Sequence, residues 1–119
     1  MQELLSGDQH SRDTKRKVLA QELNNALGTL SFTVGKGEIH SHKTNPVLVL
    51  NMYGDHYAAT LSRDPQRGKV DPGEFQGMHF QIVSGGHTIA EGRCDSRSAF
   101  LFKYDPQYEG KEATITFSA

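Results

Sequence analysis

The sequence predicts an all-β domain, namely an antiparallel β-sandwich preceded by one amphipathic α-helix. Three runs in the last third of the chain, 78–83, 98–104 and 113–118, alternate apolar with mostly polar residues. This two-residue period is typical of a strand with one buried face. Further short extended runs upstream are separated by turn residues at the spacing of a sandwich or barrel. The chain has 119 residues, which is enough to bury one core.

Residues 13–27 carry the helical pattern, with apolar residues recurring every three or four positions. The apolar stripe consists of Val18, Leu19, Leu23, Ala26, Leu27 and Leu30. Asp13 or Thr14 is suited to cap the first turn, and Gly28 is suited to follow the last one. A helix of about fifteen residues is marginal alone. We therefore expect the stripe to dock on an open end or edge of its own sheet, or on a second chain in a homo-oligomer; a linker is the third reading.

The chain divides into an N-terminal tail and helix, 1–29, and a sandwich, 30–119. The expected strands are 30–34, 38–43, 46–53, 56–62, 77–84, 87–90, 98–105 and 112–118. Gly54-Asp55 and Gly85-Gly86 are expected to form two-residue hairpin turns, because these turns need positive φ. The apolar run 47–50 predicts a central strand covered on both faces. The side chains expected to face inward are Tyr57, Ala59, Leu61, Met78, Phe80, Ile82, Phe100, Phe102, Tyr104, Ala113, Ile115 and Phe117.

Composition narrows the classes of partner and site. Lys and Arg total 13 against 14 Asp and Glu, so the net charge of −1 argues against nucleic acid or an anionic membrane attracted by net charge. The single cysteine, Cys94, excludes an internal disulfide framework. No apolar run approaches a membrane span, and the N-terminus lacks a signal-peptide pattern. The compartment stays open: cytoplasmic as given, or an excised piece of a surface or virion protein.

The order of strands and turns from residue 57 onward resembles a bacterial immunoglobulin-like domain of the invasin and intimin type. The residues that carry the resemblance are Gly73, the run 78–86, Gly92, Asp95-Ser96, the run 100–104, Gly110 and the closing run 113–119. Cys94-Asp95 stands where that family has a threonine–aspartate pair, and Ser98 stands where it has glycine. The resemblance implies an immunoglobulin-like sandwich that serves as a spacer, adhesion or recognition module at a cell or virion surface.

The histidines suggest an alternative function as a small metal-dependent, cupin-like or carbohydrate-active enzyme. His40 and His42 lie two residues apart, so both imidazoles would project from one face of a strand. With His79 they would form a site for one divalent transition metal. The alternation of His79 with Met78 and Phe80, however, places it on a polar face, where exposed histidines need no metal. We therefore expect no cofactor and no catalytic residues in the favoured interpretation.

A long loop carries the best candidates for a contact surface. Arg63, Arg67 and Lys69 stand beside Tyr53 and Tyr57, and Arg and Tyr are enriched at protein interfaces. These features favour a non-enzymatic structural or recognition module that binds a protein or polysaccharide partner. Binding would use loops or an edge strand of the sandwich. A regulatory protein that inhibits a partner enzyme is a further alternative.

Overall fold

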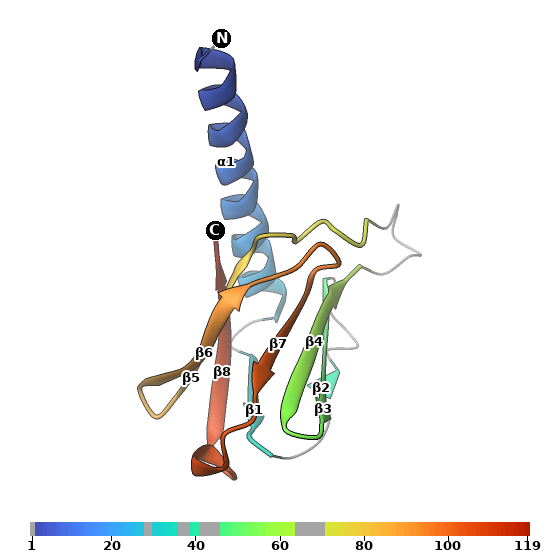
Figure 1. The fold of residues 1–119 in the computed structure, drawn as a ribbon, viewed down its shortest axis with the longest axis vertical. Helices are drawn as coiled ribbons and strands as arrows, with labels where there is room; N and C mark the ends of the chain where they lie inside the picture. Colours follow the sequence, from blue (N-terminus) through green and yellow to red (C-terminus); the bar gives the residue numbers. More distant parts are fainter. Residues whose placement is uncertain (1, 28–29, 36–38, 41–45, 64–70) are drawn as a thin grey trace.

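A computed structural model describes residues 2–27, 30–35, 39–40, 46–63 and 71–119, with side chains undescribed at 2–12 and 39–40. Within this part of the chain, eight strands form two four-stranded antiparallel sheets (Figure 1). One sheet has the order β1-β8-β5-β6 and the other the order β2-β3-β4-β7. The elements are α1 (Gln2–Leu27), β1 (Leu30–Thr33), β2 (Ile39–His40), β3 (Val47–Tyr53), β4 (His56–Ser62), β5 (His79–Ser84), β6 (His87–Arg93), β7 (Ala99–Lys103), the 3₁₀ helix η2 (Pro106–Tyr108) and β8 (Glu112–Ser118). The predicted all-β sandwich with one N-terminal helix is confirmed at this level.

The core lies between the two sheets and is built mainly from the alternating residues that the sequence predicts to face inward. Phe80 on β5 stacks on Phe100 on β7, with ring centroids 3.9 Å apart. Tyr57 stacks on Phe102 at 4.9 Å. Of the predicted inward set, Tyr104 alone is only partly buried. Contacts of this kind are where most of the folding free energy of a small sandwich arises.

The run 47–50 on β3 differs from its prediction. Leu48 and Leu50 are fully buried between the sheets, whereas Val47 and Val49 are only half-buried on the other face. The strand is central in its sheet, between β2 and β4, but it is not enclosed on both faces as predicted. An antiparallel sheet packs one face on the core and can leave the other to solvent.

The two predicted hairpin turns are confirmed. Gly54-Asp55 joins β3 to β4, and Gly54 has a φ of 60°. Gly85-Gly86 joins β5 to β6, and both glycines have positive φ, at 58° and 82°. Two-residue turns with positive φ match the right-handed twist of the strands they connect.

Helix α1 begins much earlier than the sequence predicts. It runs through Asp13 and Thr14, so neither residue is its N-cap. A helix can propagate by backbone hydrogen bonds through a segment that lacks an apolar stripe, and such a segment gives no periodic signal. The stripe also differs, because Leu19, Ala20 and Leu23 are buried while Val18 is 61% exposed. Gly28 lies outside the described residues.

Helix α1 docks on the edge of β8 through hydrogen bonds made by the side-chain amide of Asn24. Strand β1 begins at Leu30, which pairs with Ile115, so β1 does not extend along β8 as far as Phe117. Asn24 on the helix fills this place: its Nδ2 donates to the Phe117 carbonyl at 2.8 Å, and its Oδ1 accepts from the Phe117 N–H at 3.1 Å. The side-chain amide thus replaces the peptide group of a neighbouring strand. Helix α1 therefore covers an edge of the chain's own sheet, one of the alternatives that the sequence left open.

Candidate functional site

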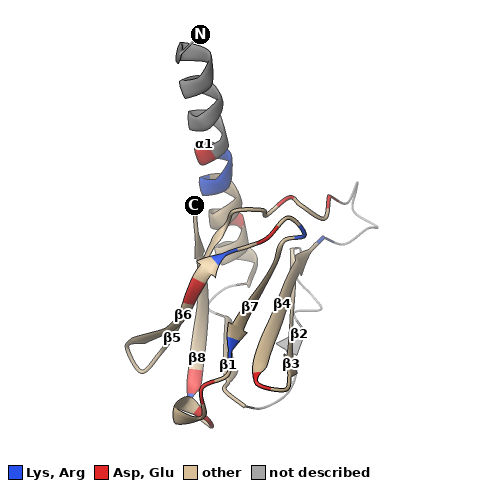
Figure 2. Cartoon of the chain, viewed as in Figure 1, with Lys and Arg blue, Asp and Glu red and all other residues tan. Residues whose placement is uncertain are grey.

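Strand β7 places an exposed apolar side chain on the outer face of its sheet. Phe100 and Phe102 point into the core and are 3% and 7% exposed, whereas Leu101 between them is 68% exposed. Its cross-strand neighbour on β4 is Ala58, which is too small to cover it. In this sheet Lys103 is the one Lys, Arg, Asp or Glu within the strands, so Figure 2 shows β3 and β4 almost entirely in tan. Leu101 therefore stands on a face of low charge.

Among the strands that the structure describes, β7 pairs with β4 on one side only. Two hydrogen bonds set its phase against β4: the Leu61 N–H donates to the Ser98 carbonyl at 3.0 Å, and the Tyr104 N–H donates to the Asp55 carbonyl at 2.7 Å. In an antiparallel ladder, successive residues direct their peptide groups to opposite sides. The even-numbered residues 98–104 thus face β4, and Ala99, Leu101 and Lys103 face away from it.

Asp95 occupies the first part of this open edge. Its N–H donates to the Ala99 carbonyl at 2.8 Å, and its Oδ1 accepts from the Ala99 N–H at 3.0 Å. Backbone N–H groups of Arg97 and Ala99 lower the pKa of the Asp95 carboxyl. Within the described part of the chain, the N–H and C=O groups of Leu101 and Lys103 are left without a partner. These four groups and the Leu101 side chain form the candidate site, which we call the β7 edge.

The neighbouring edge strand, β6, is built differently. The bond from the Cys94 N–H to the Met78 carbonyl fixes its phase, so that Glu91 and Arg93 direct their peptide groups outward. Their side chains are charged, and the register shifts between Ile82 and Val83 on the paired strand. Charged residues and irregular register are common means of protecting an edge from further pairing. Of these two strands, β7 carries the apolar, regular edge.

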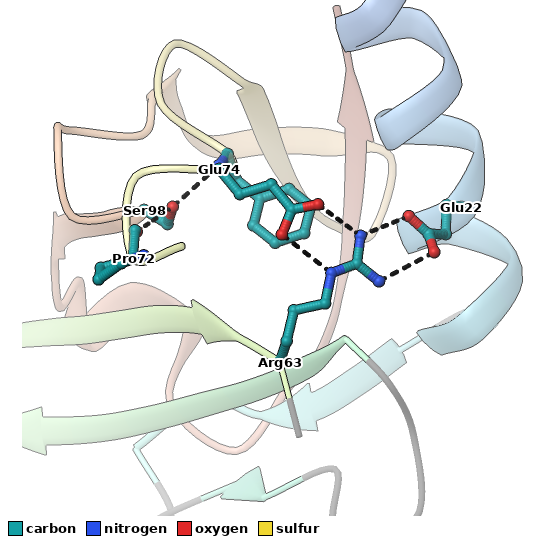
Figure 3. Close-up of polar contacts among 6 residues, drawn as sticks. Glu22, Arg63, Pro72, Glu74 and Ser98 are labelled. Carbon is teal, nitrogen blue, oxygen red and sulfur yellow. Dashed lines mark hydrogen bonds and ion pairs between the residues drawn. The ribbon is translucent and has the colours of Figure 1, made fainter. Parts of the chain in front are cut away.

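Arg63, a predicted contact residue, is already engaged within the chain. Its guanidinium forms a bidentate pair with Glu22 on α1, at 2.7 and 2.9 Å, and a second with Glu74, also at 2.7 and 2.9 Å (Figure 3). It also lies over the ring of Phe75, 5.4 Å from its centroid. The hydrogen bond from Arg63 lowers the pKa of Glu22, and the two carboxylates raise the pKa of Arg63. Arg63 therefore joins α1, the end of β4 and the turn 71–77, and four of its five N–H donors are bonded within the chain.

The other predicted contact residues are dispersed. Tyr57 is 1% exposed, as its strand alternation predicts, and its hydroxyl accepts from the Gly35 N–H at 2.6 Å, so it cannot form part of a surface. Tyr53 is 64% exposed at the end of β3. Arg67 and Lys69 lie outside the described residues. The structure thus leaves Tyr53 as the one described and accessible member of the predicted group.

Ser98 fixes the turn that leads into β7. It is buried, it has a φ of 59°, and its hydroxyl donates to the Pro72 carbonyl at 2.6 Å while accepting from the Phe75 N–H at 2.9 Å (Figure 3). Positive φ is costly for a residue other than glycine. The hydroxyl bonds stabilise this conformation, so the start of β7 is tied to the same turn that supplies Glu74.

The histidines do not converge in the described part of the chain. His79 lies on the outer face of β5, with Nδ1 3.0 Å from the Ser118 hydroxyl and Nε2 3.6 Å from a Glu91 carboxylate oxygen. His40 belongs to β2, in the other sheet, and His42 lies outside the described residues. No group of three potential metal ligands gathers among the residues that the structure describes. The proposed His40–His42–His79 set is therefore not assembled by the residues that can be placed.

Two remaining features carry little chemistry. Burial raises the pKa of the Cys94 thiol to about 12, so the thiolate that would act as a nucleophile is rare near neutral pH. A cleft of about 400 Å³ lies between Lys15, Arg16 and Leu19 on α1 and the turn 73–77. The Glu74 carboxylate in its wall is held by Arg63.

Within the described residues, no helix is long and apolar enough to cross a bilayer.

Comparisons of the chain with protein-family models, with curated proteins and with solved structures found no match. The function of the chain therefore has to be inferred from its own geometry.

Proposed function

We propose that this protein is a non-enzymatic recognition module that binds another protein chain by strand addition at the β7 edge. The observation that carries the proposal is the combination of an exposed Leu101 with four peptide groups of Leu101 and Lys103 that lack partners in the described chain. An extended segment of a partner would continue the sheet β2-β3-β4-β7 by one strand.

The energetics of such binding are modest and favour reversibility. Each peptide hydrogen bond formed in exchange for water contributes about 0.5–1.5 kcal/mol. Full burial of a leucine side chain contributes about 1.5–3 kcal/mol. Association must also offset the lost freedom of both partners. A partner side chain whose aliphatic carbons cover Leu101 would therefore add the most to binding.

The scaffold supports the same interpretation. The β-sandwich holds β7 rigidly through Phe100, Phe102 and the Ser98 turn, and a rigid strand loses little entropy on binding. An immunoglobulin-like type, and with it a role as a surface module, remains a prediction from the resemblance of residues 57–119. A sandwich that presents an edge strand or loops is consistent with that role and with an inhibitor of a partner enzyme.

A histidine enzyme is the less favoured alternative. His79 directs its ring away from the second sheet, toward Ser118 and Glu91 of its own sheet. A metal site would need His40 and His42 to reach this outer face, although β2 pairs with β3 in the opposite sheet.

The test is a display library of random seven-residue peptides selected on immobilised protein. Proline is tolerated at an edge where the N–H faces solvent, so Leu101→Pro removes one donor of the β7 edge without breaking the ladder to β4. Glu91→Pro on β6 is the matched control. We expect enrichment of alternating, β-branched peptides that bind the wild type and Glu91→Pro but not Leu101→Pro. Peptides that bind Leu101→Pro equally well, or no enrichment by a protein that is also monomeric, would contradict the proposal.

A further inference from the structure

We propose that the strand which pairs with the β7 edge is β7 of a second copy of this chain, in antiparallel orientation about a two-fold axis beside Phe102. This inference rests on the proposed function, because it names the partner of the same edge. Two-fold dimers bring the same surface of each copy together, so the surface must be complementary to itself. The β7 edge has this property in its hydrogen bonds and in its apolar side chains.

The hydrogen-bonding groups of one β7 edge match those of another. Each copy offers two residues, Leu101 and Lys103, separated by one residue that faces β4. In a register centred on Phe102, Leu101 of one copy lies opposite Lys103 of the second, and the reverse pair is generated by symmetry. Residues that lie opposite in this way exchange both N–H···O=C bonds. The N–H and C=O groups of Leu101 and Lys103, which lack partners among the described residues, are then paired on both edges.

The two adjacent two-fold registers are disfavoured by contacts already described. A register centred on Leu101 places Lys103 opposite Ala99 of the second copy, but the Ala99 peptide groups are bonded to Asp95 at 2.8 and 3.0 Å. A register centred on Lys103 places two lysines directly opposite each other, which is destabilising. Charge and hydrogen-bond occupancy together select the register centred on Phe102.

The side chains fit this register on both faces of the joined sheet. On the outer face, the methylene groups of Lys103 cover the exposed Leu101 of the other copy, and the ammonium group stays in water. On the inner face, Phe102 lies opposite Phe102 of the second copy, at the closer spacing of a pair without mutual hydrogen bonds. Phe102 already stacks on Tyr57, so the aromatic contacts of the two cores would become continuous.

A dimer that pairs through β6 is the alternative, and the experiment must distinguish it from the dimer through β7. Its Glu91 and Arg93 are spaced like Leu101 and Lys103, and in a two-fold register they would face each other with opposite charges. Between them, however, Gly92 has no side chain to bury, and Arg93 Nη1 already donates to the Gly77 carbonyl at 2.7 Å. An exposed ion pair adds little to association. The apolar residues favour β7.

Cysteine trapping tests both the interface and its register. In the proposed dimer the Cα atoms of residue 101 and of residue 103 in the second copy are about 5.5 Å apart, within the range of a disulfide, whereas equal residues are beyond it. Mixing Leu101→Cys with Lys103→Cys should give a disulfide-linked dimer, and neither variant alone should do so. Cys94 is buried and does not compete. Linkage of Leu101→Cys or Lys103→Cys alone, or linkage only in a mixture of Glu91→Cys and Arg93→Cys, would overturn the inference.

Sedimentation equilibrium supplies the second measurement. We expect the wild type to form a dimer whose dissociation constant rises about thirtyfold or more in Leu101→Pro, because two hydrogen bonds are lost per dimer. Leu101→Lys, which keeps the backbone donor, should weaken the dimer as well because it places lysines opposite each other. A wild type that stays monomeric but captures peptides through Leu101 overturns the dimer and leaves the proposed function standing. If the wild type neither dimerises nor captures peptides through Leu101, both the dimer and the proposed function are overturned.

Discussion

Strands β6 and β7, each at an edge of its sheet, carry the same backbone arrangement but different outward-facing residues. In β6, Glu91 and Arg93 direct their peptide groups outward and flank Gly92; in β7, Leu101 and Lys103 do so and flank Phe102. The charged residues of β6 favour a hydrated edge. Leu101 is 68% exposed, so covering it would lower the free energy. This difference is the reason we propose β7 rather than β6 as the binding edge: an exposed apolar side chain accompanies its outward-facing backbone groups.

The largest expected effect is a difference in the free energy of unfolding between variants on the inner and outer faces of β7. Phe100→Ala should lower the free energy of unfolding by about 3–5 kcal/mol, because it removes a ring that stacks on Phe80 at 3.9 Å in the core. Leu101→Ala, one residue away, should change that of the monomer by less than about 0.5 kcal/mol. Urea denaturation at low protein concentration measures both. Comparable losses in the two variants would show that Leu101 is covered within one chain, and the contrast with β6 would fail.

An intermediate effect is expected when β6 is made to resemble β7. Replacing both charges, Glu91→Leu with Arg93→Leu, should create a second apolar edge and strengthen self-association by about tenfold or more. Light scattering against concentration measures it. The matched control replaces the same residues by Thr, which removes charge without adding a large apolar side chain. If neither double variant associates more strongly than the wild type, the charges of Glu91 and Arg93 do not protect the β6 edge.

The smallest effect concerns the Arg63 cluster, which lies away from both edges. The pKa of Glu22 is lowered from 4.5 by its hydrogen bond from Arg63, so its ionised form stabilises the folded state. That contribution is present above the unfolded pKa of about 4.5 and is lost as the pH falls through the lower folded value. Glu22 is partly exposed, so the loss should be a few tenths of a kcal/mol.

Glu22→Gln should remove this part of the acid sensitivity while leaving association at β7 unchanged. Thermal unfolding between pH 7 and pH 3 measures the first, and sedimentation at pH 7 measures the second. If Glu22→Gln weakens association as strongly as Leu101→Pro, the Arg63 cluster and the β7 edge are coupled, and the edge cannot be treated as an independent site.

Much of the architecture was predictable because strand alternation is a local signal. The phase of Phe80 and Ile82 on β5, and of Phe100 and Phe102 on β7, follows directly from a period of two. The hairpin at Gly85-Gly86 follows from its need for positive φ. The start of α1 was wrong because residues 2–12 carry no periodic stripe, although the backbone continues as a helix.

The candidate site was predictable only in part. Alternation placed Leu101 on the outside of its strand, but nothing local distinguishes an edge strand from a central one. The role of Arg63 was missed because its partners come from positions 22 and 74, and the one signal was that Glu22 lies on the same helix as the buried Leu19 and Leu23. An arginine after a strand is equally typical of a contact surface, so the local sequence does not distinguish the two roles.

By itself the sequence determined the fold class, most of the strands, the two hairpin turns and most of the side chains that face the core, since each depends on neighbours a few residues away. Only the tertiary structure decided that β6 and β7 end their sheets, that Asn24 replaces a strand beside Phe117, and that Arg63 is neutralised by two carboxylates. These features depend on contacts between distant segments, which the packing of the whole chain selects and a local pattern does not encode. The β7 edge therefore became a candidate site only once the strand order was known.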